Sequence, residues 1–257
     1  MSATLACWLV GIVILRGAIV AGLQALSRGA FAQRHRVYDI PIRPAQRRRE
    51  RYAPLAGATL DAAAIAALVH FQVLTLGAPS WREPLILLAT HILVVEPLYY
   101  GYHRLLHTRF LYKHHHYLHH LSVVPEPNTS FTFTLAERAS YTALFALPVL
   151  AASHLGALSV IGLTLYLVIF DIANAIGHLN FEFPGKTSGR SRWRLFFYTP
   201  SFHARHHSTF IHNFSLFMPV FDHLFKTADP EEDEVLERAR SGRPFKRLGE
   251  KAKAVKA

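Results

Sequence analysis

Residues 84–107 read PLILLATHILVVEPLYYGYHRLLH, an apolar run that leads directly into two histidines. The apolar part, residues 84–101, is long enough to cross a bilayer as a helix. The spacing of four positions between His103 and His107 places both imidazoles on one face of a helix, one turn apart. This stretch therefore predicts a membrane helix that brings two candidate metal ligands to the water interface.

Other apolar runs surround this one, and together they predict an all-α fold, an integral-membrane helical bundle with a cytosolic histidine-rich cap. Residues 5–26 predict a membrane anchor, although Arg16 in its middle costs about 3 kcal/mol on insertion scales. A signal peptide is the alternative, but no Lys or Arg precedes the run. Residues 55–76 and 84–101 predict one helical hairpin, and residues 139–152 and 158–177 a second. The arm at 139–152 is short for a full span, so it is re-entrant or begins earlier.

Charge and cysteine content narrow the class of protein. The net charge of +11 stands beside apolar spans in a chain of 257 residues, which favours an anionic bilayer surface over nucleic acid as the partner. The single cysteine, Cys7, excludes an internal disulfide and a cysteine-based zinc site. An Arg-rich stretch follows the first run and, by the positive-inside tendency, lies in the cytosol. We therefore divide the chain into an anchor (1–26), a basic cytosolic loop (27–54), a membrane domain with the histidines (55–228) and a charged tail (229–257), predicted as a helix with a frayed end.

Thirteen of the 17 histidines lie at 103–120, 178 and 203–223, all on the predicted cytosolic face. Two H-x-x-H-H motifs follow the H-x3-H pair, and each places its three imidazoles on one helix face. Imidazole suits Zn, Cu, Fe and Ni, and this number of histidines is too many for one ion and right for two with open positions. The candidate metal ligands are His103, His107, His116, His119, His120, His178, His203, His206 and His207.

The remaining ionisable groups have more than one interpretation. Glu137 and Asp171 either orient ligand imidazoles as hydrogen-bond acceptors or are ordinary helix-end or surface groups. His212 and His223 are possible auxiliary ligands, whereas His70 and His91, which lie inside apolar spans, are expected to have a packing role. No H-E-x-x-H motif occurs, which argues against a zinc hydrolase.

The three histidine motifs resemble those of the fatty acid hydroxylase/sterol desaturase superfamily of membrane di-iron enzymes. The resemblance narrows to the plant cuticular-wax aldehyde decarbonylases through four further stretches: EP from residue 126, NFE from 180, YTPS from 198 and NFSLF from 213. It covers residues 97–227 and implies that the eight histidines of the three motifs bind iron, with His178 at a further ligand position of the superfamily. Hydroxylases often have a second histidine four residues before that position, and this chain has Asn174 there, as the wax enzymes do.

The resemblance implies a membrane di-iron oxidoreductase of the endoplasmic reticulum that acts on a long-chain lipid, most like an aldehyde decarbonylase of wax biosynthesis. It also implies two iron ions and electrons from NAD(P)H through a cytochrome b5-type carrier. Arginines at 34–51 and 190–194 either dock that carrier or only meet the membrane surface. Two alternatives stay open: a fatty acid or sterol hydroxylase or desaturase, and a non-catalytic partner subunit in a complex with a related enzyme. The wax enzymes carry a large soluble domain after the membrane part, and this chain ends at Ala257, so we expect either a short relative with another lipid substrate or a truncated copy.

Overall fold

The fold is described from a computed structural model, which covers residues 3–183 and 192–252. Within these ranges every regular element is a helix, and the pairings outside helices are isolated bridges, so the predicted all-α class is confirmed. The helices are α1 (Ala3–Leu26), α2 (Ala30–Arg34), α3 (Pro44–Glu50), α4 (Ala53–His70), α5 (Arg82–Thr90), the π-helical η1 (His91–Val95), α6 (Glu96–Leu106), α7 (Arg109–Leu111), the π-helical η2 (Tyr112–His116), α8 (Tyr117–His120), the 3-10 helix η3 (Pro127–Phe131), α9 (Leu135–His154), α10 (Val160–Gly177), the 3-10 helix η4 (Arg192–Leu195), α11 (Pro200–Thr209), α12 (Val220–Leu224) and α13 (Glu232–Arg240).

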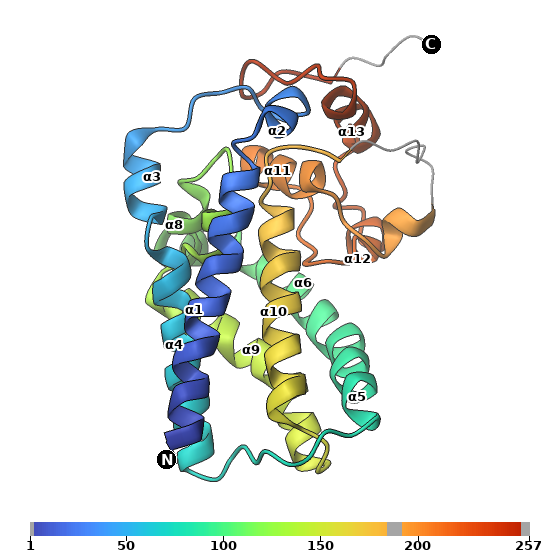
Figure 1. Ribbon diagram of the computed structural model, residues 1–257. Helices are drawn as coiled ribbons and strands as arrows, with labels where there is room; N and C mark the ends of the chain where they lie inside the picture. The colour runs from blue at the N-terminus through green and yellow to red at the C-terminus, as the bar shows by residue number, and fades with distance from the viewer. Residues whose placement is uncertain (1–2, 184–191, 253–257) are drawn as a thin grey trace.

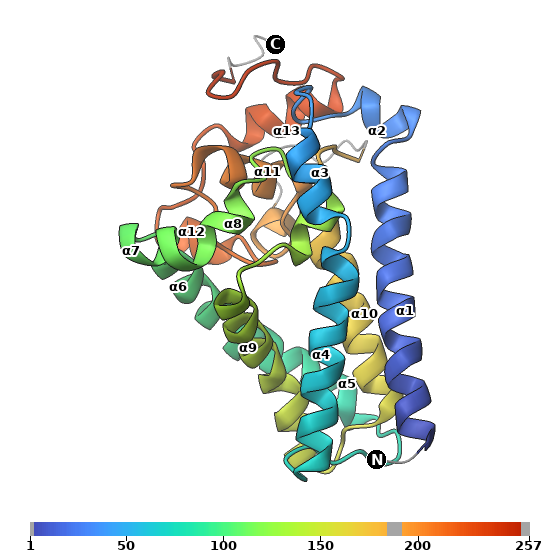
Figure 2. The same ribbon diagram turned by 90° about the vertical axis from the view of Figure 1, so that its left-hand side faces the viewer.

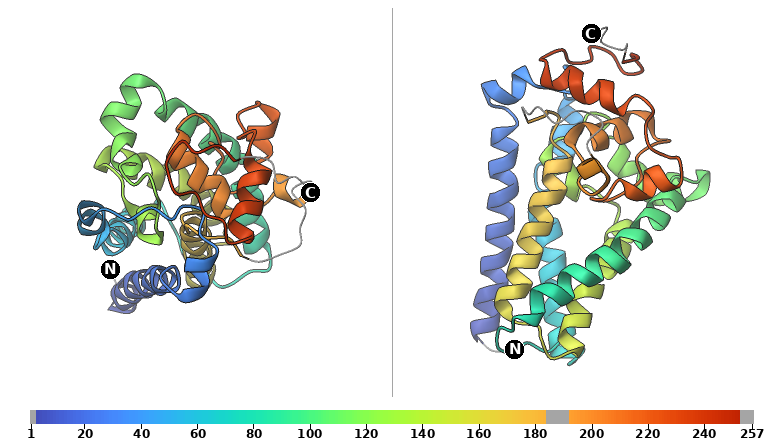
Figure 3. Two further views of the ribbon diagram at one scale, coloured as in Figure 1. Left: turned by 90° about the horizontal axis from the view of Figure 1, so that it is seen from above. Right: turned by 90° about the vertical axis from the view of Figure 1, so that its right-hand side faces the viewer.

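Four helical segments in the described part are long and apolar enough to cross a membrane: Ala3–Leu26, Pro44–His70, Arg82–Leu106 and Val160–Gly177. They form one bundle, and the short helices gather at the end where α1 finishes (Figure 1, Figure 2). The segment α5–η1–α6 runs obliquely to α1 and α10 (Figure 3, right). Helix α9 is not one of the four, but it begins at Leu135, before the predicted arm at 139–152, and has 20 residues. The two predicted hairpins are therefore present, with a longer first arm in the second one.

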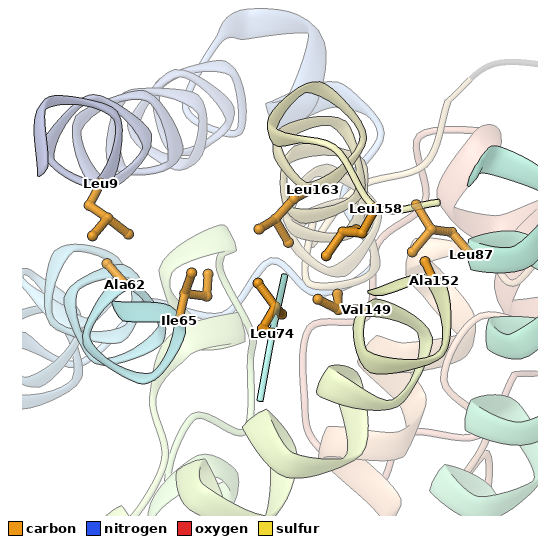
Figure 4. Close-up of a cluster of buried hydrophobic side chains, with 9 residues drawn as sticks. All are labelled: Leu9, Ala62, Ile65, Leu74, Leu87, Val149, Ala152, Leu158 and Leu163. Atoms are coloured by element: carbon orange, nitrogen blue, oxygen red, sulfur yellow. The ribbon is translucent and has the colours of Figure 1, made fainter. Parts of the chain in front are cut away.

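An apolar core fills the end of the bundle that lies away from the short helices. Its buried side chains come from α1, α4, α5, α9 and α10 and from the connections after α4 and α9, as Figure 4 shows. Leu163 and Ala152 are completely buried there. Removing apolar area of this kind from water, at roughly 25 cal/mol per Å², is the main term that holds soluble cores together, whereas close packing contributes more between helices in lipid.

A group of four charged side chains lies inside the bundle between α1, α4, α9 and α10. Arg16 donates to Asp61 (2.8 Å) and to Asp171 (2.9 Å), and Arg138 also donates to Asp61. All four are at most 8% exposed. Two positive and two negative charges in contact offset much of the cost of placing Arg16 in an apolar helix. Helix α1 is thereby tied into the bundle, beyond the membrane anchor that its sequence predicts.

The segment 27–54, which the sequence predicts to be a loop, contains the helices α2 and α3. Pro44 occupies the first turn of α3, a position where its missing amide hydrogen has no cost, and α4 follows after two residues. Gln46 and Glu50 are buried, and Gln46 donates to the carbonyl of Val124 (3.0 Å). Two short helices thus form within the predicted connection, and the segment packs against the chain that follows the second histidine motif.

The tail contains the predicted helix, α13, and it packs against the same end of the bundle. Val235, Ala239 and Phe245 are buried together with Tyr38 and Ala204, which lies in α11 between histidines. The predicted frayed end falls on 253–257, outside the described residues. We call the assembly of α2, α3, α7, α8, α11, α12, α13 and their connections the cap.

Candidate metal centre

The structure brings all nine predicted ligand histidines together where the bundle meets the cap, in two adjoining groups. The five-histidine group consists of His103, His107, His116, His120 and His206, and its candidate ligand atoms all lie within 4.8 Å of one another. The four-histidine group meets the same criterion and consists of His119, His178, His203 and His207. The ring centroids of His120 and His207 lie 4.7 Å apart, so the two groups touch.

Segments distant in the sequence build both groups. The five-histidine group takes residues from α6 and its C-cap, η2, α8 and α11, and the four-histidine group from α8, α11 and the C-cap of α10. Helix α11 contributes to both groups and lies against the end of α10 (Figure 3, left). In each H-x-x-H-H motif, the second and third histidines are neighbours in the sequence but belong to different groups.

The start of α11 is fixed by the YTPS stretch. Thr199 is the N-cap, and its hydroxyl accepts from the amide of Phe202 (3.2 Å), while Pro200 occupies the first turn. The hydroxyl of Tyr198 donates to the carbonyl of Ala173 in α10. A Cβ at Gly177 would overlap the phenol ring and hydroxyl of Tyr198, so this close approach to α10 requires glycine. These contacts dock the third histidine motif on the helix that ends at His178.

Hydrogen bonds fix the tautomers of the five-histidine group. The Nδ1 atoms of His103 and His206 lie 2.7 Å from the carbonyl oxygens of Phe214 and His212. The Nδ1 of His116 lies 2.6 Å from Oε1 of Glu137. Because a carbonyl or carboxylate oxygen accepts, each of these Nδ1 atoms carries the proton, and each Nε2 presents a lone pair. Ligand histidines in metal sites are held in this same way.

The Nε2 lone pairs face one another inside the group. The Nε2 of His116 is 3.1 Å from that of His103 and 3.0 Å from that of His120, and the Nε2 atoms of His120 and His206 are 3.1 Å apart. Because His103 and His116 both carry their proton on Nδ1, their facing Nε2 atoms cannot share a hydrogen bond. The buried Nε2 of His107 also has no hydrogen-bond partner. A cation among these lone pairs would satisfy all of them, so the residues fit a metal ion.

The four-histidine group follows the same design with longer hydrogen bonds. The Nδ1 of His178 lies 2.7 Å from the carbonyl of Asn174, and that of His119 lies 3.3 Å from the carbonyl of Thr132. The Nε2 of His178 lies 3.1 Å from that of His203 and 3.4 Å from that of His119. Both ring nitrogens of His207 are buried without a hydrogen-bond partner. This donor set also fits a metal ion.

Burial keeps these imidazoles neutral. Desolvation lowers the pKa of His178 to about 4 and that of His107 to about 2. It is also the largest cause that lowers the pKa of His119 and His207 well below the ordinary value of 6.5, and neighbouring histidines lower it further. Neutral imidazole is the form that binds a metal, so these histidines can bind one at neutral pH without first losing a proton.

The other candidate site residues that the sequence predicts have different positions relative to the two histidine groups. Glu137 accepts from His116, a candidate ligand, as one of its two interpretations predicts, because Thr134 caps α9 and places Glu137 in the first turn beside η2. Asp171 does not reach the histidines and pairs with Arg16, so its role as an imidazole acceptor was wrong. His212 and His223 belong to neither group, although the backbone carbonyl of His212 supports His206.

The two histidines inside apolar spans stay outside both groups. The Nδ1 of His91 lies 3.1 Å from the hydroxyl of Tyr166, and its ring stacks on Phe217 with 5.7 Å between centroids. This agrees with the predicted packing role. His70 ends α4 at the opposite end of the bundle and is exposed beside Phe71, so the packing role predicted for it was wrong.

A mostly apolar cavity of about 70 Å³ lies in the bundle, and the four side chains of the buried charge group form part of its lining. It is several times larger than the ~10–15 Å³ that one water needs. Asn174 and Tyr141 line it on the cap side, and the carbonyl of Asn174 is the acceptor for His178. The ring of Tyr141 packs on Phe133 at 5.0 Å, and Phe133 stacks on His119 at 5.0 Å. Two successive ring contacts thus lead from the cavity lining to the candidate metal centre.

Residues 88–227, more than half of the chain, match the family described as Fatty acid hydroxylase. The chain belongs to the fatty acid hydroxylase family. In this family member the matched segment runs from the last turn of α5 to just beyond α12 and includes all nine candidate ligand histidines.

Two curated relatives are similar in sequence to nearly two thirds of this family member. It is 44% identical over 165 residues to Protein CER1-like 1 of Arabidopsis thaliana, a match that covers 63% of this chain and 26% of the relative. It is 41% identical over 168 residues to Very-long-chain aldehyde decarbonylase GL1-7 of Oryza sativa subsp. japonica, with 64% and 27% covered. The match thus spans about a quarter of the length of these relatives. No solved structure shows a significant match.

Proposed function

We propose that this protein is a membrane di-iron oxidoreductase that converts a long-chain aldehyde into an alkane one carbon shorter, releasing the carbonyl carbon as formate while electrons from a carrier reduce O2 to the level of water. The observation that carries the proposal is the division of nine histidines, eight of them buried and His107 half-buried, into two adjoining groups in which most Nε2 atoms face one another. The substrate class rests on the printed names of relatives such as the aldehyde decarbonylase GL1-7. Asn174, in place of a second histidine before His178, supports the same choice over a plain hydroxylase.

The proposed ligands of one iron are the members of the five-histidine group, and those of the other iron are the members of the four-histidine group. A bound iron pair would supply the activation of O2 that attack on the aldehyde carbonyl carbon needs. The protein's own contribution is to hold the imidazoles neutral and oriented. Glu137 and the carbonyls of Phe214, His212, Thr132 and Asn174 keep each Nδ1 protonated, so that every supported Nε2 faces the centre.

The cavity that Asn174 lines is the proposed site for part of the alkyl chain. Its lining is mostly apolar, and burying each methylene group contributes about 0.8 kcal/mol. Its volume of about 70 Å³ suits a short stretch of chain, so the remainder of a long substrate would extend into the bilayer. Ala146 lines this cavity. We expect Ala146→Phe to shift products toward shorter chains, whereas Ala139→Phe, on an exposed face of the same helix, should leave the product lengths unchanged.

Electrons are proposed to come from NAD(P)H through a cytochrome b5-type carrier at the cap. Arg43, Arg47 and Arg48 are exposed in or beside α3, whereas Arg49 donates to Ser122 (2.8 Å) and has a structural contact. Charge complementarity would steer an acidic carrier to this surface. Of the second basic candidate, residues 190–194, positions 190 and 191 lie outside the described part, and Arg194 pairs with Glu232 and Asp233. Reversing Arg47 and Arg48 to Glu should slow reduction by the carrier at low salt, and an unchanged rate would exclude docking there.

The proposed location is the endoplasmic reticulum membrane, with the cap in the cytosol. The four candidate spans and the exposed arginines of the cap support this orientation. Cysteine accessibility at an added cap cysteine, measured in sealed microsomes, tests the orientation. Labelling only after the microsomes are opened would contradict it.

The decisive experiment combines metal analysis with a lipid profile of cells that express the chain. The proposal expects two iron ions per chain in the purified protein and alkanes in the lipid extract. Hydroxylated or unsaturated lipids without alkanes would favour the alternative of a hydroxylase or desaturase. A protein that purifies without iron, and alters lipids only with a related enzyme present, would favour the alternative of a non-catalytic partner.

A further inference from the structure

We propose that residues 212–218 form a backbone brace for the five-histidine group, and that Asp222 is the positioning residue that holds this brace. The inference rests on the proposed metal centre and concerns only one of its two halves. It gives a physical role to the NFSLF stretch at 213–217, which neither the proposed ligands nor the proposed substrate site uses.

The brace supplies two of the hydrogen-bond acceptors that fix tautomers in the five-histidine group. The carbonyl of His212 accepts from His206, and the carbonyl of Phe214 accepts from His103, both at 2.7 Å. These two imidazoles come from different helices, α11 and α6. A single segment therefore sets the relative orientation of ligands that the helices alone leave independent.

Asp222 holds the brace at the residue that supports His103. Its Oδ1 accepts from the amide of Phe214 (2.8 Å), and its Oδ2 accepts from the amide of Ser215 (2.7 Å). The hydroxyl of Thr227 donates to Oδ1 as well (2.6 Å). Asp222 is completely buried, and a buried carboxylate with three donors has one stable orientation. The carboxylate thus fixes the peptide planes on both sides of Phe214.

Asn213 completes the brace between its two carbonyls. Its φ of 63° is in the left-handed region, which asparagine tolerates better than most residues. Its amide nitrogen donates to the carbonyl of Phe202 (2.8 Å), and its amide oxygen accepts from the backbone of Asp229 (2.8 Å). The side chain is completely buried. Both ends of the amide are used, so the turn between the His212 and Phe214 carbonyls is rigid.

The brace is specific to one group. The acceptors for the four-histidine group are the carbonyls of Thr132 and Asn174, which belong to other segments. Disturbing the brace should therefore weaken metal binding at one half of the centre and spare the other. A purely structural role in the cap would weaken both halves or neither.

The test is a Co²⁺ titration of the purified full-length chain in detergent, followed by the visible absorption of the bound ion and by competition with a chelator. Wild type should bind two ions. Asp222→Asn places an amide group against two backbone N–H donors, and we expect one of the two binding steps to weaken roughly 10–100-fold. Glu232→Gln is the matched control, because it makes the same acid-to-amide change at a buried site that pairs with Arg194.

Each possible outcome of the Co²⁺ titration has a different meaning. Weakening of one step, with the control unchanged, supports the brace. Two unchanged steps, or equal weakening of both, overturn it while leaving the metal centre intact. A wild type that binds no Co²⁺ instead contradicts the proposed function. If Asp222→Asn does not accumulate, Asn213→Gly replaces it, since glycine adopts the positive φ and lacks both amide contacts, and the same selective weakening is expected.

Discussion

The two histidine groups use the same ligand type but differ in what stands behind the imidazoles. Three members of the five-histidine group have strong acceptors at 2.6–2.7 Å, and one of these acceptors is the carboxyl of Glu137. Two members of the four-histidine group have carbonyl acceptors, one of them at 3.3 Å, and His207 has no hydrogen-bond partner at either nitrogen. The five-histidine group is thus the better oriented one, whereas the four-histidine group contains His178, whose acceptor Asn174 lines the cavity.

This difference suggests different roles for the two halves of the proposed centre. Firm hydrogen bonds to the ligand imidazoles raise metal affinity, because the ligands lose less entropy on binding and are more basic. A site with fewer ligands keeps more open positions for O2 or substrate. We therefore expect the five-histidine group to bind its ion more tightly and the four-histidine group to face the reacting carbon.

Removing one ligand from each group should have the largest effect. His206→Ala and His119→Ala are both expected to abolish turnover, because the proposed reaction needs both ions. Each variant should retain one ion instead of two, measured by mass spectrometry of the purified protein. Full activity in either variant would contradict the dinuclear assignment, and membrane accumulation of each protein is the control for insertion.

Removing one charge from the buried charge group should lower the stability of the folded protein. It should leave the difference in metal affinity between the two histidine groups unchanged. Arg16→Met leaves Asp171 without its ion-pair partner inside the bundle and is expected to cost about 3–5 kcal/mol. Thermal unfolding in detergent measures this loss, with Arg28→Met at an exposed position as the control. The ratio of the metal affinities of the two binding steps should not change. A change in that ratio would show that α1 communicates with the centre.

Glu137→Gln should affect the five-histidine group alone. Burial raises the pKa of the Glu137 carboxyl, and a dication bound beside His116 would draw it back toward the carboxylate. Glutamine accepts from His116 without this charge, so we expect roughly 10-fold weaker binding in the tighter step. The measurement is the same chelator competition. Weakening of the looser step instead would reverse our ranking of the groups.

Acid should destabilise the metal-free protein by a smaller and graded amount. An unfolded histidine takes up a proton near pH 6.5, whereas His178 does so at a pKa of about 4 in the folded protein and His107 at about 2. The unfolded state therefore binds more protons below pH 6.5, and stability falls as the pH falls. The contribution of His178 should level off near pH 4, while that of His107 continues below it. Melting curves of His178→Gln and His107→Gln should each lose their own part of this slope.

Local patterns in the chain were enough to predict the fold class and the candidate ligands. Apolar runs long enough for a bilayer require helices, since lipid offers no partner for an open backbone, and the all-α bundle follows. The spacing in H-x3-H and H-x-x-H-H places imidazoles on common helix faces, and all nine candidates do meet at the cap. These inferences succeed because they depend on local periodicity.

The division of the histidines into groups, and the acceptors that support them, depend instead on how the whole chain packs. His119 and His120 are neighbours in sequence but belong to different groups, because the partners of each come from other helices. Asp171 was a reasonable imidazole acceptor until Arg16, 155 residues away, proved to be its partner. The acceptors for His103 and His206 are backbone carbonyls, which every residue carries and no motif reveals. Contacts between distant segments are set by the folded chain, and local sequence contains no record of them.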